Sequence, residues 1–117
     1  MAKKIPAGPE SELLARLRTH FAKRSDVVEK KMFGGWCFLV QGNMCCGLTG
    51  SGDLMVRVGP AAYSAALKLE HARPMDLTGT PMKGFVFVAA EGIRTGADLT
   101  AWLNRGVAYA ESLPPQN

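Results

Sequence analysis

The sequence has few of the residues that most often carry out chemistry in proteins. Its 117 residues include only two histidines and three cysteines. It has no glycine-rich phosphate-binding loop, no dinucleotide fingerprint and no nucleophile-elbow serine. His20 and His71 are isolated, and neither has metal-ligand spacing to a cysteine. The sequence therefore predicts no catalytic residue, no metal site and no cofactor, although enzymatic activity stays open.

Long hydrophobic runs are also lacking. No apolar stretch reaches the roughly 20 residues that a membrane-spanning helix needs. Residues 1–6 include two lysines, but no hydrophobic segment follows them, so no secretory signal is predicted. Three cysteines cannot all pair with one another, and free, mostly buried thiols are expected in a reducing compartment. We therefore expect a cytoplasmic protein that does not contact a membrane.

The excess of positive charge is small. Fourteen lysines and arginines against ten acidic residues give a formal net charge of +4. Much of the positive charge lies near the start of the chain, at Arg16, Arg18, His20, Lys23, Arg24, Lys30 and Lys31. Such a cluster attracts nucleic acid or an acidic partner, but it lacks alternating aromatic residues that would stack on bases. A solvated helix face is the simpler explanation, and direct binding of nucleic acid stays the alternative.

The order of the expected elements defines the fold class. Hydrophobic periodicity and glycine or proline turns predict a helix over 9–24, strands over 27–33, 36–41, 44–48 and 54–58, a helix over 61–69, strands over 72–77 and 82–89, and a last helix that stops before Pro114. Residues 1–8 and 114–117 are predicted tails around a single domain over 9–113. Pro74 places its strand near a sheet edge. The prediction is an α+β two-layer sandwich, with an antiparallel sheet, helices mainly on one face, and the order α-β-β-β-β-α-β-β-α.

The last predicted helix has an apolar stripe that includes a glycine. Its stripe residues are Leu99, Trp102, Leu103, Gly106 and Ala110. A glycine inside a helix costs about 1 kcal/mol relative to alanine. We therefore expect that Gly106 allows a close approach to the sheet or to a neighbour.

The segment from Lys31 to Gly47 is the most informative part of the chain. It is predicted as two strands joined at Gly42-Asn43 and entered through Gly34-Gly35. Alternation then places Trp36, Phe38, Val40 and Cys45 on one face, and Cys37, Leu39, Met44, Cys46 and Leu48 on the other. In this register Cys37 and Cys46 are diagonal neighbours, which are too far apart for an unstrained disulfide.

Both faces of this hairpin are therefore apolar, whereas a sheet with one wet face alternates between polar and apolar residues. Either helices cover both faces, or a second subunit covers one. Because contiguous apolar patches mark contact surfaces, we expect a homodimer with two-fold symmetry that buries Trp36 or Phe38. The alternative is a monomer whose short helix and long loops cover the second face.

Three basic residues on the later strands form a candidate anion or partner site. Arg57 lies in an otherwise apolar strand, and Arg73 and Lys83 could converge with it across the sheet. The alternative is that such a residue forms a salt bridge at a sheet edge, with Asp53, Asp76 or Glu91. Methionines also recur on the strands; they fill cores by default, but exposed methionines form adaptable protein-binding surfaces.

Several ordered motifs resemble one family. They are Lys31-Met32-Phe33-Gly34-Gly35, Leu54-Met55-Val56-Arg57-Val58-Gly59, Arg73-Pro74-Met75 and Met82-Lys83-Gly84-Phe85, with Leu99 and Trp102 in the last helix. Over about residues 11–113 the chain resembles the N-terminal domain of the TfoX/Sxy competence regulators. The resemblance implies a two-layer, secretion-chaperone-like domain in a bacterial, cytoplasmic protein. It also implies no catalytic residues.

The resemblance and the residues together favour an interaction over a reaction. In longer members of the family, this domain precedes a helical domain, and the whole promotes transcription of DNA-uptake genes alongside the cyclic-AMP receptor protein. We therefore expect a non-enzymatic protein-interaction module with an unknown protein partner. The alternative is a small-anion or metabolite-binding protein, or an enzyme, that uses Arg57, Arg73 and Lys83.

Overall fold

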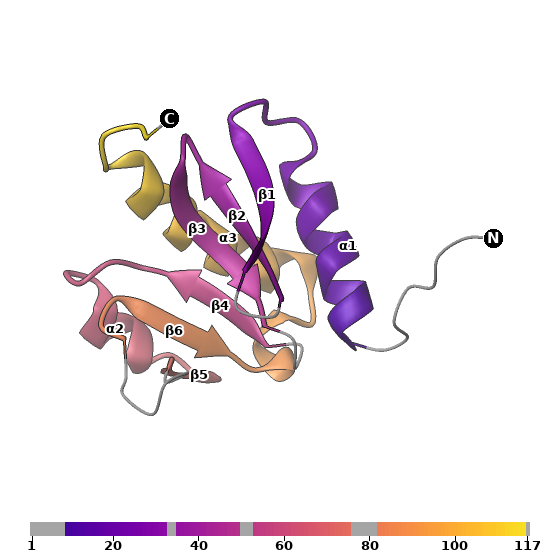
Figure 1. Cartoon of the computed structure of the whole chain (residues 1–117). Coiled ribbons are helices and arrows are strands. Elements are labelled where there is room, and N and C mark those ends of the chain that lie inside the picture. The colour runs from indigo at the N-terminus through magenta and orange to yellow at the C-terminus, as the bar shows by residue number, and fades with distance from the viewer. Residues whose placement is uncertain (1–8, 33–34, 50–52, 76–81, 117) are drawn as a thin grey trace.

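The chain folds into helices and strands in the predicted order. The computed structural model describes residues 9–32, 35–49, 53–75 and 82–116. Its elements are α1 (Pro9–Phe21), β1 (Val27–Met32), β2 (Gly35–Val40), β3 (Asn43–Leu48), β4 (Leu54–Arg57), α2 (Tyr63–Leu67), β5 (Ala72–Pro74), β6 (Phe85–Val88), the 3-10 helix η1 (Ala90–Ile93) and α3 (Gly96–Glu111) (Figure 1). The first helix ends at Phe21, so the prediction that it reaches residue 24 is wrong. The predicted tail over 1–8, and Gly34 of the predicted kink, lie outside the described residues.

The strands form one antiparallel sheet in the order β1-β2-β3-β4-β6-β5. The predicted α+β class is confirmed, and β5 is an edge strand, as Pro74 indicates. Proline cannot donate a ladder hydrogen bond, so it is tolerated where one side of the strand has no neighbour. None of the described helices is long and apolar enough to cross a membrane.

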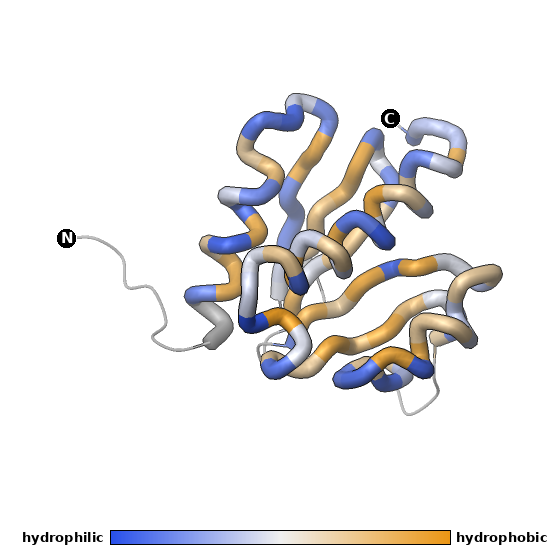
Figure 2. Tube along the Cα trace, turned by 180° about the vertical axis from the view of Figure 1, so that it is seen from behind, coloured by the Kyte–Doolittle hydropathy of each residue, from blue (hydrophilic) through white to orange (hydrophobic). Residues whose placement is uncertain are grey.

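The three helices pack on one face of the sheet. Figure 1 shows α3 behind the central strands and α1 beside β1, and in Figure 2, seen from behind, α3 lies in front of the sheet. The core on this side joins Leu13, Leu17 and Phe21 of α1 to Leu99, Trp102 and Leu103 of α3, and to Phe38, Val40, Leu48, Leu54, Val56, Val86 and Val88 of the strands. Such burial of apolar side chains is the main favourable contribution to folding.

Gly106 brings α3 against the sheet, as predicted from its place on the apolar stripe. The five predicted stripe residues of α3 are buried. A Cβ added to Gly106 would lie only 2.4 Å from the carbonyl oxygen of Cys45 on β3. Thr95 caps the start of the helix, since its hydroxyl accepts a hydrogen bond of 3.0 Å from the backbone N–H of Asp98. Close contact between the α3 and β3 backbones therefore requires glycine at this position.

The β2–β3 turn is one residue earlier than predicted. Gln41 and Gly42 form the turn, with φ of 53° and 84°, and Asn43 is already paired with Val40 as the first residue of β3. The buried amide of Asn43 donates hydrogen bonds to the carbonyls of Ala110 (3.4 Å) and Pro114 (3.0 Å). These contacts with the end of α3 fix Asn43 inside the sheet, so the predicted Gly42-Asn43 turn is wrong.

A register shift in the hairpin changes which residues share a face. Leu39 is paired with Met44 but Phe38 with Cys46, so Cys45 is an extra residue on β3. Cys45 and Cys46 consequently both belong to the helix-side core, which also contains Leu48. The predictions that Cys45 and Cys46 point to opposite faces, and that Cys46 and Leu48 share the face of Cys37, are therefore wrong.

Candidate interaction surface

The sheet face opposite the helices carries a second apolar cluster. Among the described residues, none of the members of this cluster lies on a helix. Its buried members are Cys37, Met55, Met75 and Phe87, and its half-buried members are Leu39, Met44, Met82 and Phe85. Val28 lies opposite Leu39 and extends the cluster onto β1. We call these nine residues the open sheet face.

The open sheet face becomes more exposed toward β1. Met55 is fully buried on β4, Leu39 is half-buried on β2, and Val28 is 53% exposed on β1. Large apolar side chains are normally buried, so an exposed one that continues an apolar cluster indicates a contact surface. The methionines predicted to fill a core do so in part, since Met55 and Met75 are fully buried while Met44 and Met82 are partly accessible.

A hollow of about 590 Å³ lies at the β1 end of this face. Val28 and Leu39 provide its apolar wall, and Asp26 and Lys30 bring charges of opposite sign to its lining. Gln116 also lines it, because the Gln116 amide donates a 2.8 Å hydrogen bond to the Gln41 carbonyl. The chain after α3 therefore turns back onto the β2–β3 turn and helps to build the hollow.

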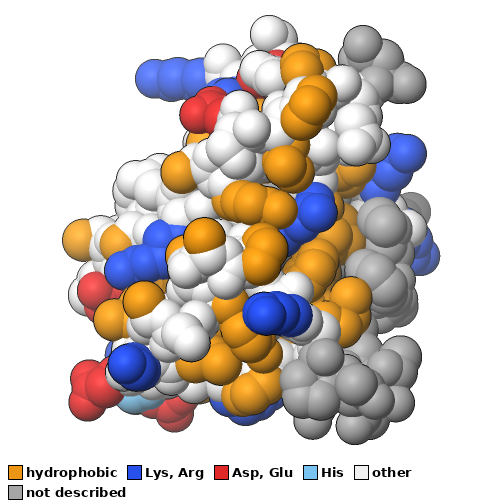
Figure 3. Space-filling view, turned by 90° about the vertical axis from the view of Figure 1, so that its left-hand side faces the viewer, with side chains coloured by type: hydrophobic (Ala, Val, Ile, Leu, Met, Phe, Trp, Pro, Cys, Tyr) orange, Lys and Arg blue, Asp and Glu red, His pale blue; other side chains and the backbone are white. Residues whose placement is uncertain are grey.

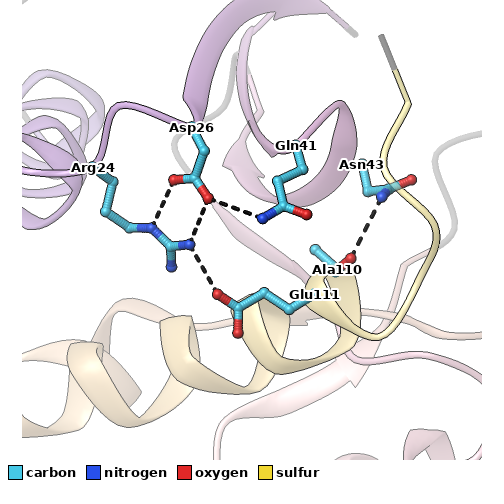
Figure 4. A network of polar contacts seen from close by, with 6 residues as sticks. All are labelled: Arg24, Asp26, Gln41, Asn43, Ala110 and Glu111. Atoms are coloured by element: carbon cyan, nitrogen blue, oxygen red, sulfur yellow. Dashed lines mark hydrogen bonds and ion pairs between the residues drawn. The ribbon is translucent and has the colours of Figure 1, made fainter.

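A network of polar contacts supports this end of the sheet (Figure 4). The Arg24 guanidinium donates to both carboxylate oxygens of Asp26, at 3.0 and 2.8 Å, and to Glu111 of α3 at 2.8 Å. The side-chain amide of Gln41 donates a hydrogen bond to the Asp26 carboxylate at 3.3 Å. Hydrogen bonds from Arg24 lower the pKa of Asp26, and those to Asp26 and Glu111 raise the pKa of Arg24. This network connects the start of β1 to the end of α3.

Arg57 is held between two aromatic rings. Its guanidinium carbon lies 5.6 Å from the ring centre of Phe85, which is its neighbour on β6, and 5.2 Å from that of Tyr109 on α3. These distances are in the range of cation–π contacts. No acidic side chain of the described residues forms a salt bridge with Arg57. The two rings therefore contact this cation, and its N–H groups have no carboxylate partner in that part of the chain.

Arg73 and Lys83 are placed differently from Arg57. Arg73 stacks on Phe87 at 4.9 Å and donates a 3.1 Å hydrogen bond to Asp53, which is one of the predicted edge salt bridges. Lys83 is exposed in the turn before β6. Arg57 and Arg73 lie on opposite sides of β6 on one sheet face. No described contact brings the three predicted residues together on one anion.

The two predicted interface residues lie on the helix side of the sheet. Phe38 is 2% exposed and stacks on Phe21 of α1, with ring centres 5.3 Å apart. Trp36 is half-buried, and its ring contacts the cations of Arg18 (5.4 Å) and Lys31 (5.6 Å). Phe38 therefore contributes to the core of one chain, and Trp36 is the more accessible of the pair.

The basic residues near the start of the chain are partly engaged within the fold. Arg18 forms two hydrogen bonds with Glu29, at 2.9 and 2.6 Å, and these raise its pKa. Arg16 donates to the Thr95 carbonyl at 3.2 Å. These contacts, together with the Arg24 network, favour the interpretation of a helix and strand surface with internal ion pairs over that of a nucleic-acid site.

The cysteines are free and buried, as predicted. Burial raises the pKa of the Cys37 thiol to about 11. A hydrogen bond with Cys45 and burial raise the pKa of Cys46. Thiols with raised pKa values remain protonated near neutral pH and are poor nucleophiles. Within the described part of the chain, no three histidine, cysteine, aspartate or glutamate side chains gather closely enough to hold a metal ion.

Sequence reasoning missed two features of this surface. It did not identify Tyr109 as the partner of Arg57, because 51 residues separate the two and no local pattern links them. It also did not identify Val28 as exposed, although the alternation of Val28 with the charged Glu29 on β1 was a signal that the two point to opposite faces.

Comparison with known families identifies the fold family. The sequence model of the TfoX N-terminal domain matches residues 19–110, which is most of the chain. Comparisons with curated proteins and with solved structures gave no match. The match covers every strand, α2, and nearly the whole of α3. The chain therefore belongs to the TfoX N-terminal domain family, which is linked to competence regulation.

Proposed function

We propose that this domain is a non-enzymatic protein-interaction module that acts in regulation, and that the β1 end of its open sheet face is a contact surface. The observation that carries the proposal is the apolar cluster on the helix-free face, which continues outward to the exposed Val28. The raised pKa values of Cys37 and Cys46 also favour a structural role over a nucleophilic one.

A second copy of the chain is the partner that we propose for this surface. A two-fold contact places the same residues on both sides, so the surface must complement itself. The hollow meets this requirement, because its lining holds both Asp26 and Lys30 beside the apolar Val28 and Leu39. Lys30 of one copy can then approach the Arg24–Asp26–Glu111 network of the other, in which two carboxylates share one guanidinium, while the apolar side chains pack together. This arrangement places the homodimer on the open sheet face, with Phe38 left in the core.

Light scattering on the purified chain tests the proposal. The expected mass is twice 12.6 kDa at micromolar concentration. The Val28→Glu variant should be monomeric with unchanged circular dichroism, because a carboxylate would be buried without a partner at the contact. Leu69→Glu is the matched control, since Leu69 is an exposed large hydrophobic residue (39%) on another surface and should stay dimeric.

Two results would contradict this assignment. A mass near 12.6 kDa for the unmodified chain would show that it does not self-associate. A dimer that Leu69→Glu disrupts but Val28→Glu does not would place the contact beside α2 instead.

A further inference from the structure

A second surface, formed by α2 and α3, has a different chemical character. The two helices enclose a groove of about 520 Å³. Alanines from both sides line it, together with Val58, Leu69, Tyr109 and Arg105, and no acidic residue of the described segments does. Because alanine side chains end at a methyl group, they leave space that larger apolar residues would fill. Figure 3 shows this side of the molecule, where apolar atoms alternate with lysine and arginine side chains and acidic groups lie toward the margins.

One cation lines this groove, and a second contacts one of its lining residues without lining the groove itself. Tyr109 lines the groove and also supports the guanidinium of Arg57. Arg105, one turn earlier on α3, lines the groove and lies 4.6 Å from the ring centre of Trp102. Both guanidinium groups are held by aromatic rings, so little conformational freedom remains to be lost when an anion binds them.

A comparison within the same sheet indicates which group Arg57 can bind. Arg73 and Arg57 flank β6 and each stacks on a phenylalanine of that strand. Arg73 has its carboxylate within the chain, from Asp53 at 3.1 Å. Arg57 has no such salt bridge within the described residues. A guanidinium in contact with an aromatic ring still presents N–H groups in its own plane, and these match a carboxylate.

We propose that the α2–α3 groove binds a segment of a partner protein in which a bulky apolar side chain lies next to aspartate or glutamate. The apolar side chain enters the alanine-lined groove, and the carboxylate pairs with Arg57 beside Tyr109. Arg105 adds a positive charge to the groove lining itself, which favours acidic segments and disfavours basic ones. This site is distinct from the proposed dimer contact at Val28, so either can fail without the other.

The test begins with a display library of random peptides, selected on the full chain and counter-selected on Leu69→Glu. Leu69 lines the groove, and a carboxylate there removes apolar contact and repels acidic peptides. The expected sequences combine a bulky apolar residue with a neighbouring aspartate or glutamate. Binding of the best peptide is then measured by fluorescence anisotropy at two salt concentrations, and its affinity should fall as salt rises.

Matched arginine variants identify the contact. Arg57→Gln should weaken binding of the selected peptide about tenfold or more, because a charge-assisted hydrogen bond is lost. Arg73→Gln should change it less than about twofold, since Asp53 already pairs with Arg73. Replacing the peptide's acidic residue with its amide should reproduce the loss on the unmodified chain, which keeps the test valid if Arg57→Gln folds poorly. Val28→Glu should bind the peptide normally.

Several outcomes would overturn the proposal. They are selected peptides without acidic residues, equal binding to Leu69→Glu, equal effects of Arg57→Gln and Arg73→Gln, or no enrichment at all. Displacement of the selected peptide by duplex DNA at moderate salt would instead assign this basic surface to nucleic acid.

Discussion

Replacing Gly106 with alanine tests the contact that joins the two layers of this fold. In an ordinary helix, this change stabilises a protein by about 1 kcal/mol, because glycine has the greater conformational freedom when unfolded. Here the added Cβ would lie 2.4 Å from the Cys45 carbonyl oxygen and 3.1 Å from its sulfur. The nearer atom belongs to the backbone of β3, which is held between two neighbouring strands and cannot move away alone.

The expected magnitude follows from these opposing effects. Overpacking a core costs about 1–3 kcal/mol, and contact with a fixed backbone atom favours the upper end of that range. After the helix-propensity gain of about 1 kcal/mol, we expect Gly106→Ala to be destabilised by about 2 kcal/mol. For a domain near 100 residues, this corresponds to a fall in Tm of roughly 8–16 °C.

Urea unfolding, with the slope m compared between variants, measures the effect. Gly96→Ala is the matched control, because it lies at the first position of α3 and nothing lies within 4 Å of its added Cβ. It should be stabilised by about 0.4–1 kcal/mol. Cys45→Ala should not rescue Gly106→Ala, since the carbonyl oxygen remains. A Gly106→Ala variant as stable as the unmodified chain would refute the close contact between α3 and β3.

Three further predictions concern the supporting contacts. Arg24 lowers the pKa of the Asp26 carboxyl in the folded chain, so the unfolded chain binds a proton at Asp26 more readily. The stabilisation that Asp26 provides is therefore fully present above its ordinary pKa of 3.8, and it is lost as pH falls through the lower pKa of the folded chain. The unfolding midpoints of the unmodified chain and Asp26→Asn should therefore differ near neutral pH and converge in acid. A difference between the two midpoints that does not change with pH would contradict this. With its pKa raised to about 11, the Cys37 thiol should react with a disulfide reagent at pH 8 only as fast as the protein opens; rapid labelling of the native chain would show an accessible thiolate. Asn43→Ala should lower the free energy of unfolding by about 1–3 kcal/mol in urea, because it removes two hydrogen bonds, to the carbonyls of Ala110 and Pro114; an unchanged midpoint would mean that water replaces the amide.

The order of elements could be predicted from the sequence because each one depends on local chemistry. Pro74 limits a strand to an edge, and the 3.6-residue spacing of Leu99, Trp102 and Leu103 defines a buried stripe. Gly106 was informative because glycine destabilises a helix, so its presence on the buried stripe indicated a close contact with another part of the fold. In each of these segments, the residues of the segment itself determine which side chains are buried and where the element ends.

The hairpin register could not be predicted because distant residues determine it. Gly42-Asn43 is a favourable two-residue turn by local propensity. The buried Asn43 amide is instead used to bind two carbonyls near the end of α3, and this requires Gln41 to adopt a positive φ. One displaced residue and the extra Cys45 then change the face on which Cys46 and Leu48 lie. A sequence contains no local sign that a turn residue will be used by a helix 67 positions away.

The difference between local and distant determinants also explains which parts of the candidate sites could be predicted. The apolar pattern of the hairpin correctly indicated that the sheet has two apolar faces, but only the packing shows that the helices cover the face of Phe38 and leave that of Leu39. The three basic residues were individually visible, yet their chemistry depends on partners that differ. Asp53 neutralises Arg73, whereas Arg57 is held by aromatic rings. A charge within an apolar strand is thus a reason to examine a position, and the partner found there determines whether it stabilises the fold or remains able to bind another molecule.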